Sequence, residues 1–177
     1  MRTLIKILSG GQTGVDQAAL RGGKACGLEI GGWCPPGRVC ETGVIPPEFP
    51  LQETERERSP DAPDIPRSQR TEWNVRDSDA TLVLRFADRG KGSQSAGTDW
   101  AMQCAARYRR PLLVCDVNDP NAKAKIQAWL DATPISTLNV AGPSEAASRG
   151  IGDRAYTLLL EVFSPAEDER SERNSTG

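Results

Sequence analysis

Short apolar runs alternate along the chain with segments in which apolar residues recur every three or four positions. The first run covers residues 3–8, and the second kind of spacing follows over residues 15–26. Runs of the first kind are typical of strands, whereas the second spacing predicts one buried face of a helix. This order recurs about five times, which predicts a parallel sheet, because right-handed crossovers place a helix between successive strands.

The individual elements follow from the same pattern. The predicted strands are residues 3–8, 28–33, 80–86, 110–117 and 135–140. The predicted helices are residues 15–26, 100–108, 122–130 and 151–162, with a short helix or turn over residues 70–79. The third strand is apolar without alternation, as expected when helices cover both faces of a sheet. We therefore expect one α/β domain with a Rossmann-like open, mainly parallel sheet and helices on both faces.

Two regions fall outside this pattern. Residues 41–68 are rich in proline and charge, and they are expected to form a surface excursion that is too polar to build a core. Residues 164–177 are polar almost throughout and are expected to form a disordered tail. The folded domain is therefore expected to span residues 1–163.

Composition and charge narrow the function classes. The formal net charge is −2, so no basic field favours nucleic acid or an anionic membrane. No apolar stretch reaches the ~18 residues of a membrane span and no secretory signal opens the chain, so we expect a cytoplasmic protein. The five cysteines contain no CxxC pair and are expected to be reduced, mostly in the core. Histidine is absent, which excludes histidine bases, triads and metal ligands.

Glycine-bearing loops follow four of the predicted strands: "SGGQTG" at residues 9–14, "PPGR" at 35–38, "GKGSQSAGT" at 90–98 and "AGPS" at 141–144. Such loops meet at the carboxyl edge of an open α/β sheet. Backbone N–H groups and helix N-termini can there bind an anion. The residues expected to contact it in these loops are Gly10, Gly11, Gln12, Thr13, Gly14, Asp16, Ser95, Gly97, Thr98, Gly142, Pro143 and Ser144.

A purely structural role stays open for each of these loops. The Gly-Gly pair can be a tight turn, Asp16 can cap its helix, and Ser95 or Thr98 can be an N-cap. The first loop also lacks the Gly-Lys-Ser/Thr of a Walker A motif and the GxGxxG spacing of a dinucleotide site. An ordinary ATPase or NAD dehydrogenase is therefore disfavoured.

Three arginines could add positive charge to a bound anion. They are Arg38, Arg70 and Arg76. The alternative for each is an ion pair with a neighbouring acidic residue. For Arg76, which lies beside Asp77 and Asp79, the two interpretations are equally open.

Four segments together resemble the molybdenum cofactor carrier protein family, within the Rossmann-like superfamily that includes the LOG (lysine-decarboxylase-like) proteins. They are "LSGGQTGVDQA" at residues 8–18, "GGWCPPGR" at 31–38, "RTEWNVRDSDATL" at 70–82 and "LNVAGP" at 138–143. The resemblance covers nearly everything except the tail. It implies a homo-oligomer, a dimer or tetramer, that binds molybdenum cofactor, protects this molybdopterin from oxidation and passes it to molybdoenzymes.

On this resemblance, the terminal phosphate of the molybdopterin would lie at the converging helix N-termini. Asn74, Asp77 and Asp79 could form hydrogen bonds with the pterin ring. Cys34 could meet molybdenum as a thiolate, although a role in the core or the turn is preferred. No dedicated metal site and no catalytic residue are assigned.

The chain departs from the LOG phosphoribohydrolases at one position. Their motif PGGxGTxxE ends in a glutamate that serves N-glycosidic chemistry, whereas "SQSAGTDWA" keeps Gly97 and Thr98 and places Ala101 at the glutamate position. That activity is therefore doubtful. The alternative function is a LOG-like protein or hydrolase for a nucleotide-derived ligand, such as a nucleoside monophosphate or ADP-ribose; a plain oligomeric scaffold is the third.

Overall fold

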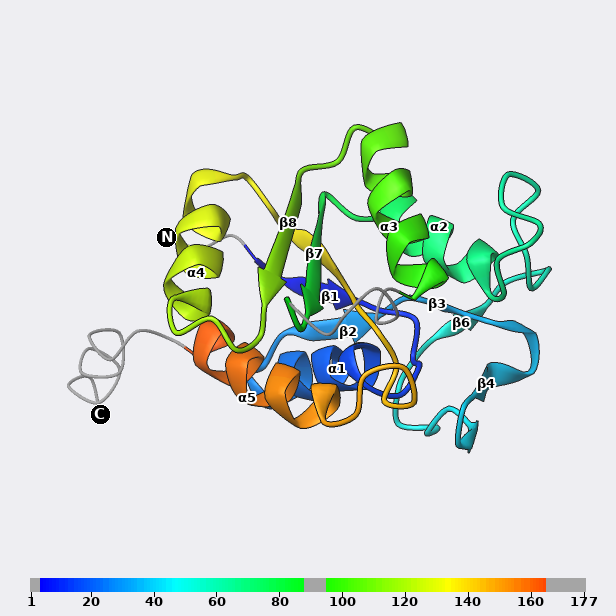
Figure 1. Cartoon of the computed structure of the whole chain (residues 1–177), viewed down its shortest axis with the longest axis horizontal. Helices are drawn as coiled ribbons and strands as arrows, with labels where there is room; N and C mark the ends of the chain where they lie inside the picture. Colours follow the sequence, from blue (N-terminus) through cyan, green and yellow to red (C-terminus); the bar gives the residue numbers. More distant parts are fainter. Residues whose placement is uncertain (1–3, 88–94, 165–177) are drawn as a thin grey trace.

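A five-stranded parallel sheet forms the centre of the computed structural model, which describes residues 4–87 and 95–164 (Figure 1). Its strands are β1 (Lys6–Leu8), β2 (Glu29–Gly31), β7 (Ala80–Arg85), β8 (Leu112–Asp116) and β9 (Thr137–Ala141), in the order β2-β1-β9-β7-β8. All four pairings between neighbouring strands are parallel. The predicted Rossmann-like α/β fold is confirmed.

Helices cover both faces of this sheet. One face carries α1 (Val15–Ala25), α4 (Ala122–Ala132) and α5 (Ile151–Phe163), whose apolar residues join the sheet in the largest core cluster. Figure 1 shows α1 and α5 side by side beneath the strands, with α2 (Ser68–Arg76) and α3 (Ala96–Arg107) together on the other side. The third predicted strand is buried along nearly its whole length, because helices cover both its faces.

The strand order shows a rearranged connectivity. β9 is the last strand of the chain, yet it lies between β1 and β7. If β9 is counted first, the order becomes 3-2-1-4-5, that of a Rossmann sheet. The order reverses between β9 and β7, and ligands of such sheets bind in the crevice at that reversal. By this rule a ligand site is expected beyond the carboxyl ends of these two strands.

The segment between β2 and α2 differs from the expected polar excursion. It contains β3 (Trp33–Cys34), the 3₁₀ turn η1 (Pro36–Arg38), β4 (Val39–Cys40), β5 (Gly43–Val44) and β6 (Gln52–Glu53). Ile45, Phe49 and Leu51 are buried with Leu20 of α1 in a second apolar cluster. The expectation that residues 41–68 are too polar to build a core was therefore wrong, because a few widely spaced apolar side chains suffice to anchor the segment.

The side chain of Arg38 stabilises this segment through hydrogen bonds to its backbone. Its backbone adopts a left-handed conformation with φ 52°. Its guanidinium donates hydrogen bonds to the carbonyl oxygens of Leu51, Pro46 and Phe49. A guanidinium provides five donors in a fixed fork, so one side chain can gather several carbonyls of an irregular loop. Arg38 thus shapes the loop.

Of the predicted terminal tail, only Ser164 lies within the described residues. Its hydroxyl donates to the carbonyl of Leu160 at the end of α5. The rest of the predicted tail, residues 165–177, lies outside them, as do residues 90–94 of the third glycine-bearing loop.

Candidate anion-binding site

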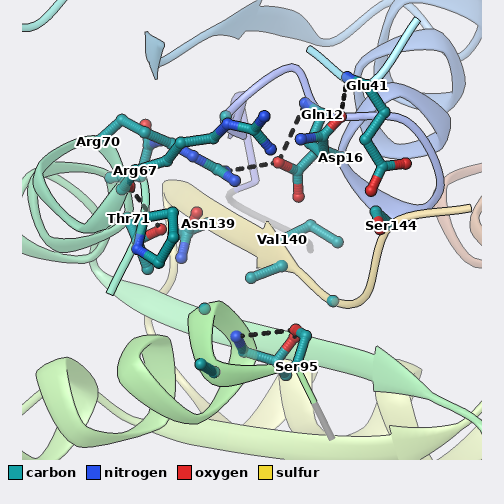
Figure 2. Close-up of a pocket in the computed structure, with 18 residues that line it drawn as sticks. Gln12, Asp16, Glu41, Arg67, Arg70, Thr71, Ser95, Asn139, Val140 and Ser144 are labelled. Atoms are coloured by element: carbon teal, nitrogen blue, oxygen red, sulfur yellow. Dashed lines mark hydrogen bonds and ion pairs between the residues drawn. The ribbon is translucent and has the colours of Figure 1, made fainter. Parts of the chain in front are cut away.

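A cavity of about 230 Å³ lies at the carboxyl edge of the sheet (Figure 2). Four parts of the chain form its walls: the loop between β1 and α1, the start of α2, the start of α3, and the end of β9. Glu41 and Ser144 complete one side. The cavity therefore occupies the crevice where the strand order reverses.

An ion pair forms the upper wall of the cavity in Figure 2. Arg70 Nη1 lies 2.6 Å from Asp16 Oδ2, and this oxygen also accepts the backbone N–H of Gln12. Asp16 is only 3% exposed. Arg70 Nε is buried and has no partner among the described residues. One donor of Arg70 is therefore left unsatisfied in the described part of the chain.

Gly10 makes room for this ion pair. A Cβ atom on Gly10 would lie 1.8 Å from Arg70 Nη1. The first glycine of "SGGQTG" thus allows the guanidinium to lie against the loop backbone, a close approach that a side chain would block.

Arg67 brings a second guanidinium to the same wall. It is the N-cap residue of α2, in a left-handed conformation with φ 59°. Figure 2 shows its side chain beside that of Arg70, reaching across the top of the cavity. Its guanidinium has no hydrogen-bond partner within residues 4–87 and 95–164. Its charge helps to lower the pKa of the Glu41 carboxyl, but in the described part of the chain it is not held in an ion pair as Arg70 is, so its N–H donors remain unsatisfied.

The N-terminus of α3 faces these arginines from the opposite wall (Figure 2). Ser95 is its N-cap, and the Ser95 hydroxyl accepts the N–H of Thr98 at 3.1 Å. The N–H groups of Ala96 and Gly97 have no acceptor in the described part of the chain. Unsatisfied N–H groups and the positive end of the helix dipole favour an anion at this position.

The N-terminus of α5 is already occupied by a side chain. Glu145 accepts the N–H of Gly150 and that of Gly152, the latter at 3.1 Å. α5 follows β9, and in a Rossmann sheet the helix after the corresponding strand binds the dinucleotide phosphates. The Glu145 carboxylate satisfies these donors internally, whereas the first N–H groups of α3 have no acceptor among the described residues.

Glu41 links the β4–β5 hairpin to the cavity. Partial burial raises the pKa of its carboxyl, but hydrogen bonds from Ser144, from the Thr13 hydroxyl and from the N–H of Ala146 outweigh this effect and lower the pKa overall. Gln12 reinforces the link, because its side-chain oxygen accepts the N–H of Glu41. Glu41 is therefore a carboxylate at neutral pH.

Acid is expected to destabilise this link. Because the pKa of Glu41 is lowered in the folded state, its stabilising contribution is complete above the ordinary value of 4.5 and is lost as the pH falls below it. Thermal unfolding followed between about pH 7 and about pH 3 should show this loss. Glu41→Gln should have a shallower pH dependence than the wild type in that window. An unchanged slope in the variant would contradict the assignment.

Ten of the eighteen predicted site residues line the cavity. They are Gly10, Gln12, Asp16, Arg70, Asn74, Ser95, Gly97, Thr98, Gly142 and Ser144. Within this group Asn74 has a structural task as well, because its side-chain amide exchanges two hydrogen bonds with the backbone of Trp33.

Four predicted residues support the cavity from behind. A Cβ atom on Gly11 would approach Ile45 and Leu51, so Gly11 faces the second apolar cluster. Thr13, Gly14 and Pro143 join the first loop to the last: the Thr13 hydroxyl accepts the N–H of Glu145, and the Pro143 carbonyl accepts the N–H of Val15. Gly14 has a φ of 81°, and a Cβ atom there would strike the backbone of residues 143–145.

The structure places four other predicted residues away from the cavity. Arg38 is engaged in the loop described above. Arg76 is paired with Asp77 and lies over the ring of Trp73. Asp79 directly precedes β7, so it lies at the amino edge of the sheet, where it accepts the N–H groups of Ser136 and Thr137.

Several cavity residues carried no clear signal in the sequence. They are Glu41, Pro66, Arg67, Thr71, Ala96, Asn139, Val140 and Ala141. Arg67 and Arg70 are three positions apart, a spacing that puts two side chains on one helix face, so this pair could have been found. Glu41 could not, because it reaches the cavity through a long irregular segment.

Cys34 lies in the second apolar cluster and is fully buried. Burial raises the pKa of its thiol. These observations agree with the preferred core role. Within the described residues, no group of three or more cysteine, aspartate or glutamate residues is arranged to hold a metal ion. None of the described helices is long and apolar enough to cross a membrane.

Comparisons with known proteins agree with this fold. A crystal structure of a putative molybdenum carrier protein from Syntrophus aciditrophicus SB is similar to the chain, with a TM-score of 0.79 and 34% sequence identity over 92% of this chain and 96% of that one. No curated protein is significantly similar. A model described as the circularly permutated YpsA SLOG family matches residues 7–163. Together with the displaced position of β9, this match shows that the chain belongs to the circularly permuted YpsA SLOG family.

Proposed function

We propose that the chain is a carrier protein that binds molybdenum cofactor and delivers it to molybdoenzymes. The phosphate of the molybdopterin would lie between Arg67 and the N-terminus of α3, with the pterin extending along the end of β9. Two findings support the proposal: the similar protein is named a molybdenum carrier, and the cavity has the donors that a phosphate requires.

The observation that carries the proposal is the uncompensated set of donors across the cavity. The guanidinium of Arg67 lacks a partner within the described residues, and so do the N–H groups of Ala96 and Gly97. A hydrogen bond to a charged group contributes roughly 1.5–3 kcal/mol, and one helix dipole adds about 0.3–1 kcal/mol. Several such contacts together would bind a phosphate despite the acidic net charge.

The protein would contact the organic part of the cofactor and not the molybdenum. The described lining of the cavity contains no cysteine, and Cys34 is enclosed in the second apolar cluster. A carrier also needs no acid or base for turnover. The position of the LOG glutamate is occupied by Ala101, which is fully buried.

A nucleoside monophosphate is the second candidate, because the same donors fit any phosphate monoester. Two observations disfavour a larger dinucleotide-like ligand such as ADP-ribose. Glu145 occupies the N-terminus of α5, and the cavity of about 230 Å³ is smaller than the ~300–1,000 Å³ typical of pockets for drug-sized ligands.

Cargo analysis tests the proposal. The wild-type protein, purified without oxygen from molybdenum-replete cells, is expected to contain molybdenum and a pterin that becomes fluorescent after oxidation, in equal amounts. Arg67→Gln should lose most of both, because it removes the unpaired cation. Mass spectrometry of molybdenum and pterin fluorescence give the two readouts.

Arg154→Gln is the matched control for this experiment. It removes the same charge from an exposed position on α5, away from the cavity, and is expected to retain the cargo. Consistent absence of both molybdenum and pterin from the wild type, together with tight binding of a nucleoside monophosphate, would favour the second candidate. The homo-oligomer stays a prediction, to be measured by light scattering on the same samples.

A further inference from the structure

The walls of the cavity differ in chemistry. Arg67 and the first N–H groups of α3 are donors without acceptors in the described part of the chain. Asp16 and Glu41, by contrast, are acceptors on the side of the β1–α1 loop and the β4–β5 hairpin (Figure 2). A ligand that satisfies both sets has an anion in one part and hydrogen-bond donors in another.

Asp16 has one carboxylate oxygen that lacks a donor among the described residues. Its Oδ2 atom receives Arg70 Nη1 and the N–H of Gln12. Its Oδ1 atom has no partner among the described residues, and Figure 2 shows it pointing into the cavity. Because the residue is only 3% exposed, this oxygen depends on whatever enters the cavity for a hydrogen bond.

Glu41 differs from Asp16 because its carboxylate oxygens already have donors. Its carboxylate already accepts hydrogen bonds from Thr13, Ser144 and Ala146. It therefore adds negative charge to the same side of the cavity without offering its oxygens as freely as Asp16 does. That charge favours a ligand edge made of N–H groups and disfavours one with exposed acceptor atoms.

We propose that Asp16 recognises the N–H and amino edge of a 2-amino-4-oxo-pyrimidine ring, the edge that pterin and guanine share. This inference rests on the proposed function, because the phosphate of the same ligand would lie at Arg67 and α3. The edge presents two neighbouring donors, and a carboxylate accepts from such an edge without repulsion. Adenine presents one amino group beside a ring nitrogen whose lone pair would face the carboxylate. Asp16 is thus a specificity-determining residue that selects pterin- or guanine-type rings over adenine.

Three nucleotides that differ only in the base test this inference: GMP, IMP and AMP, each titrated calorimetrically into the wild-type protein. GMP has both donors of the edge, IMP has the ring N–H without the amino group, and AMP has the unfavourable acceptor. GMP is expected to bind roughly tenfold to a hundredfold more tightly than AMP, with IMP between them, since a hydrogen bond to a charged group has that effect on affinity.

Asp16→Asn is expected to abolish this preference. Its GMP-to-AMP affinity ratio should fall to about twofold or less, because an amide lacks the charge that favours two donors. The ratio separates recognition from a general weakening of the cavity, and a melting curve reports whether the variant is folded. The wild-type series decides the question by itself if the variant does not fold.

Arg67→Gln separates this inference from the proposed anion site. It should weaken the binding of all three nucleotides by the same factor and leave their ratio unchanged. Equal affinities of the wild type for GMP and AMP would overturn the role of Asp16 while leaving the anion site in place. Absence of binding for all three would overturn this inference and the second candidate function, whereas the carrier proposal is decided separately by the molybdenum and pterin content of the purified protein.

Discussion

Arg70→Leu is expected to lower the free energy of unfolding by about 3 kcal/mol, since removing one partner of a buried ion pair leaves the other charge uncompensated. The side chains of Asp16 and Arg70 are 4% and 15% exposed and lie 2.6 Å apart, so little water replaces the lost guanidinium. Chemical denaturation of the wild type and the variant gives the difference directly.

The surface pair on the same helix is the matched control. Arg76 and Asp77 also form an ion pair, but their side chains are 38% and 37% exposed. Arg76→Leu should therefore cost less than about 1 kcal/mol. The double variant with Asp16→Asn and Arg70→Leu should recover much of the loss, because no buried charge then remains. Equal effects of Arg70→Leu and Arg76→Leu would contradict the buried pair.

Gly142→Ala is expected to destabilise the fold by about 3 kcal/mol through overpacking. A Cβ atom at this position would lie 2.3 Å from the carbonyl oxygen of Leu84 in β7 and 2.6 Å from Cγ2 of Val15. The first of these neighbours is backbone at the centre of the sheet and cannot rotate away. Thermal or denaturant unfolding measures the loss.

Gly97→Ala is the control within the same set of predicted site glycines. Among the described residues, a Cβ atom at Gly97 would meet nothing within 4 Å, and the residue lies in the first turn of α3. Alanine should therefore leave stability unchanged or raise it by up to ~1 kcal/mol, through its better helix propensity. A loss at Gly97 as large as that at Gly142 would show that the surroundings of the two glycines have been misjudged.

Gly97 and Gly142 show which part of the candidate site could be predicted from the sequence. Both stood in loops expected at the carboxyl edge, and both line the cavity. Their surroundings differ: Gly142 permits a close approach to β7, whereas no described residue lies near the position of a Cβ atom on Gly97. A sequence pattern locates a glycine on a loop, but it does not say which atoms a side chain would meet.

The aspartates of the predicted site show the same limit of prediction from sequence. Asp77 and Asp79 were assigned to the ring of a ligand on resemblance, yet Asp79 precedes its strand and so lies at the opposite edge of the sheet. The position of Asp79 could have been predicted, because a residue that directly precedes a parallel strand lies at the amino edge of the sheet, opposite the edge at which ligands bind. The ion pair of Asp16 was not foreseeable, since Arg70 is 54 positions further along the chain.

By itself the sequence determined the α/β class, the order of the main strands and helices, the edge at which three of the four glycine loops meet, and the resemblance to molybdenum cofactor carriers; the "PPGR" loop does not line the cavity. These properties follow from local periodicity and from motifs that are short in sequence. The tertiary structure alone decided that β9 lies between β1 and β7, that Glu145 fills the N-terminus of α5, and that Arg67 is left without a partner within the described residues. Each of these depends on contacts between distant segments, which form only once the chain has folded.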